Sequence, residues 1–468
     1  MPYPLRLPMQ LGCSQYNGFM LGILLLSITC LAIDRPRISA LLFAVLLNLK
    51  HLYLSAAPFF FVHLLAGYVF KNHASARDRE MGGIEAGRYI RMTALHGAVA
   101  RLVALGSVVV CVFGISLLPF FALGQFWQLI RRLFPFGRGL VHAYWAPNSW
   151  ALYTAADRAL AFMSRGNGRL SHFIASFVRT EATASLRATS GLVGEAPMAV
   201  LPQVRPGHTA LLVVLLQSPV LVGTWINPSR RAAAAAVAYC SLAAFLLGWH
   251  AHEKAVLPPL VIVAAAAPVD FVGAQLHARL LLLLSAAGHY AQLPLLHRPA
   301  EYVLARILLL LYHVCARIVL SQRIGQLAEV ADQGPDCGDM ELDGREIFGP
   351  KTDRVKTPGQ MRRAVGLPTL LRSYEEAFLI GFFPLELFVS VVHPFLLGER
   401  LSFLPLLCTS VYCAVGVHYC TYLMLLLWKQ QRQLSETHAF PPRATSSPTP
   451  AIVGPGTPLH GNDKVKIS

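Results

Sequence analysis

The chain has 468 residues, of which 55% are hydrophobic and only 14% are charged. Ordinary soluble domains carry about 25% charged residues, so the composition excludes a soluble globular protein and indicates an integral membrane protein. The formal net charge of +16 does not point to a nucleic-acid ligand. Its lysines and arginines gather between apolar segments, where the positive-inside rule accounts for them.

Eleven apolar segments follow one another along the chain without strand-like alternation. We therefore predict an all-α polytopic membrane protein with about eleven transmembrane helices. A straight crossing needs about 20 residues, so the shorter segments predict tilted or broken helices. Pro58, Pro258 and Pro259 predict local breaks, because proline removes a backbone donor. The segments lie at residues 18–33, 38–50, 52–70, 101–120, 209–226, 232–249, 254–270, 278–296, 302–320, 374–394 and 403–428.

Alternate threading of these segments gives each connection a side of the membrane. Arg35, Arg37 and the basic segment 321–373 share one side, which the positive-inside rule makes cytosolic. The opposite, luminal side receives the long loop 121–207, although this loop is rich in arginine. Loops longer than about 60 residues cross a membrane largely regardless of charge, so the assignment stands.

The predicted organisation has six parts, in which membrane helices alternate with polar segments. Residues 330–365 and 436–468 are expected to be disordered, since their composition cannot bury enough apolar area to fold. Residues 464–468 resemble a cytosolic dilysine signal for return to the endoplasmic reticulum. The parts are N-terminal transmembrane helices at 1–120, a luminal loop with short helices at 121–207, central transmembrane helices at 208–320, a cytosolic loop with the disordered insertion at 321–373, a C-terminal transmembrane hairpin at 374–430 and a cytosolic tail at 431–468.

Residues 247–254 place two histidines, a glutamate and a lysine between two apolar runs. Ionisable groups at the mouth of a membrane span cost several kcal/mol unless water, a partner or a ligand satisfies them. A lone histidine there is more often an interfacial residue with a hydrogen-bond partner. The combination of His250, His252, Glu253 and Lys254 favours a functional site, and it suits the phosphate of a lipid-linked substrate.

Two further polar breaks fall on the same predicted face of the membrane. Lys50 and His51 interrupt an apolar region. Lys50 could also simply carry its charge to the membrane surface on its flexible stem. His289 forms the other break, and packing accounts for it as well as function does. These residues are candidates beside the 247–254 cluster.

The stretch 131–150 combines arginines with closely spaced aromatic residues. Arginine binds phosphate through two parallel hydrogen bonds, and aromatic rings stack on sugars or lie at the lipid interface. A sugar-phosphate site and an interfacial aromatic belt therefore both fit this stretch. The sequence contains no cysteine–histidine spacing of the zinc type, no P-loop and no dinucleotide fingerprint.

Four stretches of the chain share their residues with one known family, and they lie at residues 15–18, 43–53, 131–153 and 252–254. They resemble the endoplasmic-reticulum glucosyltransferases of glycosyltransferase family 57, which build the oligosaccharide for N-glycosylation. The resemblance runs from about residue 15 to residue 430, apart from 330–365. Within the family, residues 142–148 and 409–416 are more similar to the members that add the second glucose than to those that add the first.

The resemblance implies a GT-C fold in the endoplasmic-reticulum membrane with the active face in the lumen. Glucose would pass from dolichyl phosphate glucose to a dolichyl-pyrophosphate-linked oligosaccharide that already bears one glucose. The new linkage would be α-1,3, formed with inversion from a β-linked donor. No metal or other cofactor is implied, and the expected partners are the two dolichyl lipids and the membrane, not nucleic acid.

The same resemblance places His252 and Lys254 near the donor phosphate, where they would stabilise charge on the leaving group. Inverting transfer also needs a carboxylate that takes the proton of the acceptor hydroxyl, and Glu253 lies nearest to the candidate site. We assign His252 and Glu253 as catalytic candidates. The candidate substrate-binding residues are polar or aromatic residues of the luminal face: Lys254, His250, Lys50, His51, Arg132, Arg138, His142, Trp145, Tyr16, Asn17 and His289.

One departure from the family pattern bears on activity. The family's base is an aspartate in the first luminal loop, whereas residue 15 of this chain resembles the luminal end of the fourth span. We therefore expect an N-terminally truncated product with little or no transferase activity. Two alternatives stay open: the related enzyme that adds the first glucose, and a non-catalytic lipid transporter or lipid-sugar-binding membrane protein.

Overall fold

The computed structural model describes ten stretches of the chain, and all regular structure within them is helical. The predicted all-α class is therefore confirmed. The described residues are 6–70, 84–134, 136–141, 145–166, 168–179, 197–267, 273–296, 299–332, 370–398 and 401–439.

The chain begins with a helical hairpin that runs into a broken helix. The hairpin consists of α1 (Arg6–Ala32) and α2 (Pro36–Leu49), which pack against each other. Ser27 and Ser39 join the two helices, with 3.2 Å between their hydroxyl oxygens. Pro58 lies in the first turn of α3, where its missing donor is tolerated, so the chain breaks at this proline as the sequence predicts. The broken helix comprises η1 (His51–Ala56), α3 (Ala57–Leu64) and η2 (Leu65–Val69).

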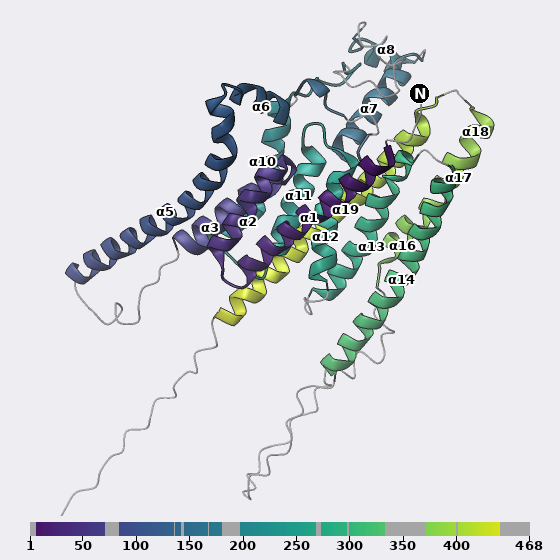
Figure 1. The fold of residues 1–468 in the computed structure, drawn as a ribbon. Helices are drawn as coiled ribbons and strands as arrows, with labels where there is room; N and C mark the ends of the chain where they lie inside the picture. The colour runs from purple at the N-terminus through teal and green to yellow at the C-terminus, as the bar shows by residue number, and fades with distance from the viewer. Residues whose placement is uncertain are drawn as a thin grey trace, which may run out of the picture.

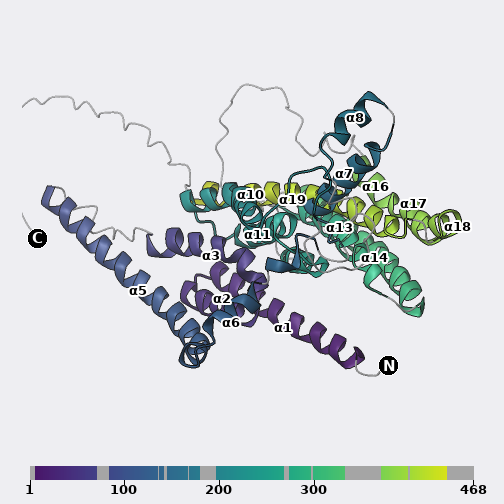
Figure 2. The same cartoon turned by 90° about the horizontal axis from the view of Figure 1, so that it is seen from above.

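A long outer helix and several short helices follow. α5 (Ile84–Ala122) lies at one edge of the bundle in both views, opposite α18 (Figures 1 and 2). The short helices α6, α7 and α8 lie toward the same end of the bundle in Figure 1, and Figure 2 shows α6 beside α2, apart from α7 and α8. Their bounds are Phe126–Leu133 for α6, Phe136–Arg138 for η3, Ser149–Met163 for α7 and Arg169–Ala175 for α8.

The second half of the chain supplies the centre of the bundle and its other edge. The central helices are α10 (Pro206–Ile226), α11 (Ala233–Leu247), η4 (Glu253–Val256), α12 (Leu257–Ala266), α13 (Ala274–Tyr290) and η5 (Leu293–Leu295). The later helices are α14 (Pro299–Asp332), α16 (Ser373–Ile380), α17 (Phe382–Leu387), η6 (Phe388–Val392), α18 (His393–Leu396) and α19 (Leu404–Ala439).

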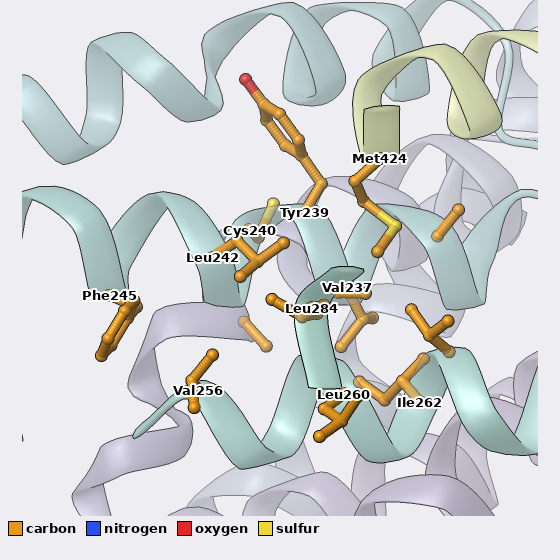
Figure 3. Packing of buried hydrophobic residues seen from close by; sticks show 14 of the residues in the cluster. Val237, Tyr239, Cys240, Leu242, Phe245, Val256, Leu260, Ile262, Leu284 and Met424 are labelled. Carbon is orange, nitrogen blue, oxygen red and sulfur yellow. The ribbon is translucent and has the colours of Figure 1, made fainter. Parts of the chain in front are cut away.

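The core of the bundle forms around α11. Twelve of its 15 residues are buried, as expected for a helix that is apolar on all sides. Its alanine-rich first turns let α10, α12 and α19 approach closely. Figure 3 shows α11 side chains, among them Val237 and Cys240, packed with Leu284 of α13 and Met424 of α19.

A buried ion pair fixes three helices against one another. Arg279 of α13 and Glu375 of α16 lie 2.6 Å apart, and the Tyr419 hydroxyl of α19 donates to the same carboxylate at 2.6 Å. A charged pair inside a membrane bundle is retained only when its members satisfy one another. This pair therefore ties the register of α13, α16 and α19 together.

Each of the eleven predicted segments is helical over most of its length, but their lengths differ. In the described part of the chain, six helices are long and apolar enough to cross a membrane. Three shorter apolar helices, Asn17–Ala32, Pro36–Leu49 and Ala233–Leu247, belong to the hairpin and the core. The six long segments are His51–Val69, Leu95–Ala122, Pro206–Ile226, Glu301–Leu327, Ser373–Leu396 and Leu404–Ser435.

Two helices run further than the expected membrane segments. α14 continues to Asp332 and α19 to Ala439, whereas the sequence predicts their ends near residues 320 and 428. The extra residues are rich in Gln, Glu, Leu and Ala, which favour helix, so polar turns extend each apolar span. Most of the insertion 330–365 and of the tail 436–468, both expected to be disordered, lies outside the described residues.

Candidate functional site: a basic cavity at one end of the bundle

A cavity of about 510 Å³ opens between four parts of the fold: α1, the α2–η1 corner, α6 with the residues after it, and the α11–η4 corner. Its volume lies in the range of small-molecule sites, about 300–1,000 Å³. The lining residues are Asn17, Leu21, Lys50, His51, Leu52, Tyr53, Ser55, Arg132, Leu133, Phe134, Phe136, Ser241, Ala244, Phe245, Gly248, Trp249, His250, Ala251, His252, Lys254, Ala255, Leu257 and Pro258.

The cavity has a basic part and an apolar part. Three cationic side chains, those of Lys50, Arg132 and Lys254, come from three separate elements. Among the described residues, neither aspartate nor glutamate lines the cavity to balance them. Leu21 and Phe245 belong to the apolar part of the wall. This combination suits an amphipathic anion, with its charge on the basic part and its hydrocarbon on the apolar part.

The hairpin geometry brings Asn17 and Lys50 together. α1 and α2 turn near residue 34, and Asn17 and Lys50 lie about equally far from this turn on the two helices. α2 ends at Leu49 because Lys50 adopts an extended backbone, with φ −156° and ψ 117°. The Lys50 ammonium donates a hydrogen bond to Oδ1 of Asn17 at 2.7 Å. Two residues that are 33 positions apart in sequence thus form one polar wall of the cavity.

The α11–η4 corner forms a second polar wall. Glu253 is fully buried, while the His252 side chain is 45% exposed, and Nδ1 of His252 lies 2.5 Å from Oε2 of Glu253. This short contact orients the His252 ring against the buried carboxylate, and Nδ1 also accepts a hydrogen bond from the Lys254 backbone nitrogen at 3.4 Å. His252 lines the cavity but Glu253 does not. The structure therefore places Glu253 behind His252, away from a position where it would meet a substrate.

The third wall comes from the end of α6. Arg132 lies in the last turn of α6 and is exposed, and Phe134 follows directly after the helix. The Phe134 ring lies 6.1 Å from the His51 imidazole at an angle of 59°. An arginine and an aromatic ring at the rim of a basic cavity are suited to a phosphate and a sugar face.

Seven of the predicted site residues meet in this cavity, and two others lie elsewhere. Trp145 is buried against Arg158, whose guanidinium carbon lies 4.5 Å from the indole centroid. His289 packs on Tyr312, with 5.9 Å between the ring centroids. Both residues make aromatic contacts within the scaffold, and neither lines the cavity. The residues that meet are Asn17, Lys50, His51, Arg132, His250, His252 and Lys254.

Three predicted residues cannot be placed at the cavity. Tyr16 and Arg138 lie in described helices, but their side chains are outside the described part of the structure. His142 lies outside the described residues altogether. Their assignment as substrate-binding residues stays a prediction.

Asp157 is a carboxylate of the segment 121–207 with a scaffold role. It is buried and accepts hydrogen bonds from the backbone nitrogens of Ala199, Val200 and Leu201 at 2.8–2.9 Å. Burial and the nearby Asp157 charge raise the pKa of Tyr153, whose hydroxyl donates to Pro202. Asp157 thus holds the far end of the segment against α7.

The neighbouring Arg158 stacks on two aromatic rings. Its guanidinium lies over the Phe403 ring at 4.9 Å as well as over Trp145. Burial lowers the pKa of Arg158, and the adjacent Asp157 charge opposes that shift. By its stacking on Trp145 and Phe403, Arg158 packs α7 against the segment that leads into α19.

Sequence reasoning did not identify the apolar part of the cavity. Ser241, Ala244 and Phe245 line it from α11, and Gly248 lines it just after the helix ends. The spacing of the three helical residues puts them on one helix face. That period is visible in the sequence. The sequence does not single out this face, because α11 is apolar on every side.

A polytopic helical bundle with a basic, partly apolar cavity defines a membrane protein suited to an amphipathic anionic ligand. The family model described as "ALG6, ALG8 glycosyltransferase family" matches residues 12–424. The chain belongs to this family, and the expectation drawn from the four sequence stretches is confirmed at that level.

Several curated proteins are similar to most of the chain, and those from Arabidopsis thaliana, Mus musculus and Bos taurus are all named "Dolichyl pyrophosphate Glc1Man9GlcNAc2 alpha-1,3-glucosyltransferase". The one from Arabidopsis thaliana is 37% identical over 410 residues, which cover 86% of this chain and 68% of that protein. The one from Mus musculus is 36% identical, with 86% and 65% covered. The one from Bos taurus is 34% identical, also with 86% and 65% covered. The chain thus spans about two thirds of the length of these relatives.

Proposed function

We propose that the chain binds dolichyl phosphate glucose in the basic cavity and transfers its glucose to a dolichyl-pyrophosphate-linked oligosaccharide that already bears one glucose. The linkage formed is α-1,3, and the reaction takes place on the luminal face of the endoplasmic-reticulum membrane during assembly of the N-glycan precursor. The observation that carries this proposal is the convergence of Lys50, Arg132 and Lys254 on one cavity with an apolar wall. The names of the relatives, which specify a Glc1Man9GlcNAc2 acceptor, support the step.

The donor fits the two parts of the cavity. A phosphodiester carries one negative charge, which the three cations and His252 can bind through charge-assisted hydrogen bonds. The first isoprenoid units are apolar, and Leu21, Phe245 and the neighbouring lining residues offer them a wall. The glucose ring then lies near the rim, where Phe134 provides an aromatic face.

The reaction that follows is a displacement at the anomeric carbon of the donor glucose. The bond between that carbon and the phosphate oxygen breaks, and dolichyl phosphate leaves with the electron pair. The acceptor hydroxyl attacks from the opposite face, which turns a β-linked donor into an α-linked product, and its proton passes to a base. Lys254 and His252 stabilise the charge that grows on the leaving phosphate, and Glu253 acts through His252 by orienting its ring.

One observation favours a second candidate function, a protein that binds the lipid-linked sugar without turnover. Glu253, which lies directly behind the cavity-lining His252, is fully buried against it. In that position it supports donor binding better than it supports abstraction of a proton from an acceptor. The first-glucose enzyme is the remaining alternative, and it differs only in the acceptor.

A direct assay separates these functions. The chain is reconstituted in lipid nanodiscs with radiolabelled dolichyl phosphate glucose and with acceptors that bear no glucose or one glucose. Transfer to the monoglucosylated acceptor alone supports the proposal, whereas transfer to the glucose-free acceptor identifies the first-glucose enzyme. Saturable donor binding without transfer to either acceptor identifies the binding protein, and absence of donor binding overturns all three assignments.

A further inference from the structure

The α11–η4 corner makes a set of hydrogen bonds that the donor site itself does not explain. We call residues 136–141 the strap, because this segment crosses from α6 toward the corner and follows the rim residue Phe134. The Trp249 indole nitrogen donates to the Phe136 carbonyl at 3.1 Å. The backbone nitrogen of His250 donates to the Leu140 carbonyl, also at 3.1 Å. Both ends of the strap are therefore tied to two adjacent residues.

The His250 side chain contributes a third tie. Its Nδ1 lies 3.1 Å from the Gly139 carbonyl oxygen, which can only accept a hydrogen bond, so Nδ1 carries a proton and donates it. The backbone of His250 has a φ of +52°, a conformation that side-chain-bearing residues adopt only when surrounding contacts stabilise it. The three hydrogen bonds to the strap are such contacts.

The strap is continuous with donor-site residues. Arg132 and Phe134 line the cavity immediately before it in sequence, and Phe136 lines the cavity from within it. A second anchor holds the same corner from α7, because the Trp150 indole donates to the Gly248 carbonyl at 3.0 Å. Release of the strap would therefore free the wall that carries Arg132 while the corner itself stays in place.

We propose that Trp249 and His250 are positioning residues that latch the strap and thereby hold Arg132 and Phe134 at the donor phosphate. His250 acts through Arg132 in this assignment, and it is not itself the phosphate ligand that its place in the 247–254 cluster first suggests. The inference rests on the proposed donor site for its functional consequence, but the latch is a property of the fold and can be measured without a ligand.

The latch is tested by hydrogen exchange on the full chain in nanodiscs. W249F removes one tie and keeps the backbone donor of His250, so exchange of the amide at position 250 and of peptides covering 136–141 is expected to rise about fivefold to tenfold. H250A should do the same for the strap peptides. H250N is the matched control, because asparagine tolerates a positive φ and its amide can donate to the Gly139 carbonyl. Unchanged exchange in both W249F and H250A overturns the latch.

The route through Arg132 is tested by donor binding in a double-mutant cycle. H250A is expected to weaken binding of dolichyl phosphate glucose about fivefold to tenfold in the wild-type background, with H250N restoring most of it. In the Arg132→Ala background the same H250A change should have less than about a twofold effect. An undiminished effect there shows that His250 contacts the donor directly, and it overturns the positioning role. Faster exchange with no donor binding by the wild-type chain would instead leave the latch standing and refute the proposed function.

Discussion

The Lys50 ammonium donates a hydrogen bond to Oδ1 of Asn17 across 2.7 Å, and both side chains line the basic cavity. The bond aims the charge of a flexible lysine at one point in the cavity. A membrane-surface lysine that only snorkels would have no such partner from the other arm of a hairpin. The hydrogen bond therefore favours a role of Lys50 in the site over the alternative that Lys50 only carries its charge to the membrane surface.

Removal of the Lys50 charge is expected to weaken donor binding. Lys50→Met keeps the length and apolar stem of the side chain but loses the ammonium, and it should lower affinity for dolichyl phosphate glucose about tenfold to a hundredfold. Asn17→Ala removes only the aiming contact and should cost about twofold to fivefold. Equilibrium binding in nanodiscs measures both. An Asn17→Ala effect as large as that of Lys50→Met would show that Asn17 itself binds the donor.

His252 and Glu253 are expected to behave as one unit. Glu253→Ala leaves the His252 ring without the carboxylate that orients it, so its effect on donor binding should match that of His252→Ala, about tenfold. The double variant should then be no worse than either single variant, because each change removes the same function. Glu253→Gln keeps the size of the side chain and a polar contact beside Nδ1, and it should lose much less. Additive effects in the double variant would separate the two residues and contradict the pairing.

Asp157 is expected to hold the segment 197–201 against α7. Asp157→Asn replaces a carboxylate oxygen by an amide nitrogen, which cannot accept, so the three backbone donors lose part of their partnership. The expected loss is about 1–3 kcal/mol of stability, seen as a lower melting temperature and as protease cleavage in this segment. The matched control is Asp34→Asn, since Asp34 is 61% exposed in its ion pair with Arg230. An equal effect of the two variants would rule out the scaffold role.

Close packing of α19 on α16 is expected to depend on Gly416. A Cβ atom built there would lie 2.4 Å from the Phe378 ring, so Gly416→Ala should overpack the interface and cost about 1–3 kcal/mol. Phe378→Leu should relieve part of that cost in the double variant. Gly114→Ala is the control, because nothing lies within 4 Å of a Cβ at that position of α5. Thermal unfolding in detergent compares the variants, and a Gly416→Ala protein as stable as the Gly114→Ala protein would contradict the packing.

Much of the fold could be predicted from the sequence because apolar length and proline position act locally. The eleven apolar segments are all largely helical, and Pro58 marks the start of α3. Alternate threading of the segments also predicted that Asn17 and Lys50 lie on the same side of the membrane. The ends of α14 and α19 were harder to predict. Both helices continue past their apolar residues through helix-favouring turns that contain Gln, Glu and Ala.

The sequence predicted those residues of the candidate site that place an ionisable side chain beside an apolar segment. The basic and imidazole residues of 247–254 and Lys50 stood out because ionisable groups are costly beside membrane spans. Their partners did not stand out: the contact of Glu253 with His252 and the burial of Trp145 over Arg158 depend on how side chains pack. His289 resembled the other polar breaks in sequence, but α13 directs it toward Tyr312 and away from the cavity.

The central claim, that the cavity cations bind a lipid-linked sugar phosphate, is tested most directly by binding of dolichyl phosphate glucose to charge-matched variants. One variant changes Lys50 and Lys254, which line the cavity, to methionine. The other changes Arg165 and Arg169, which are exposed outside it, to methionine. We expect the first to lose at least about fiftyfold in affinity and the second less than about twofold. Equal affinities in the two variants would contradict the account.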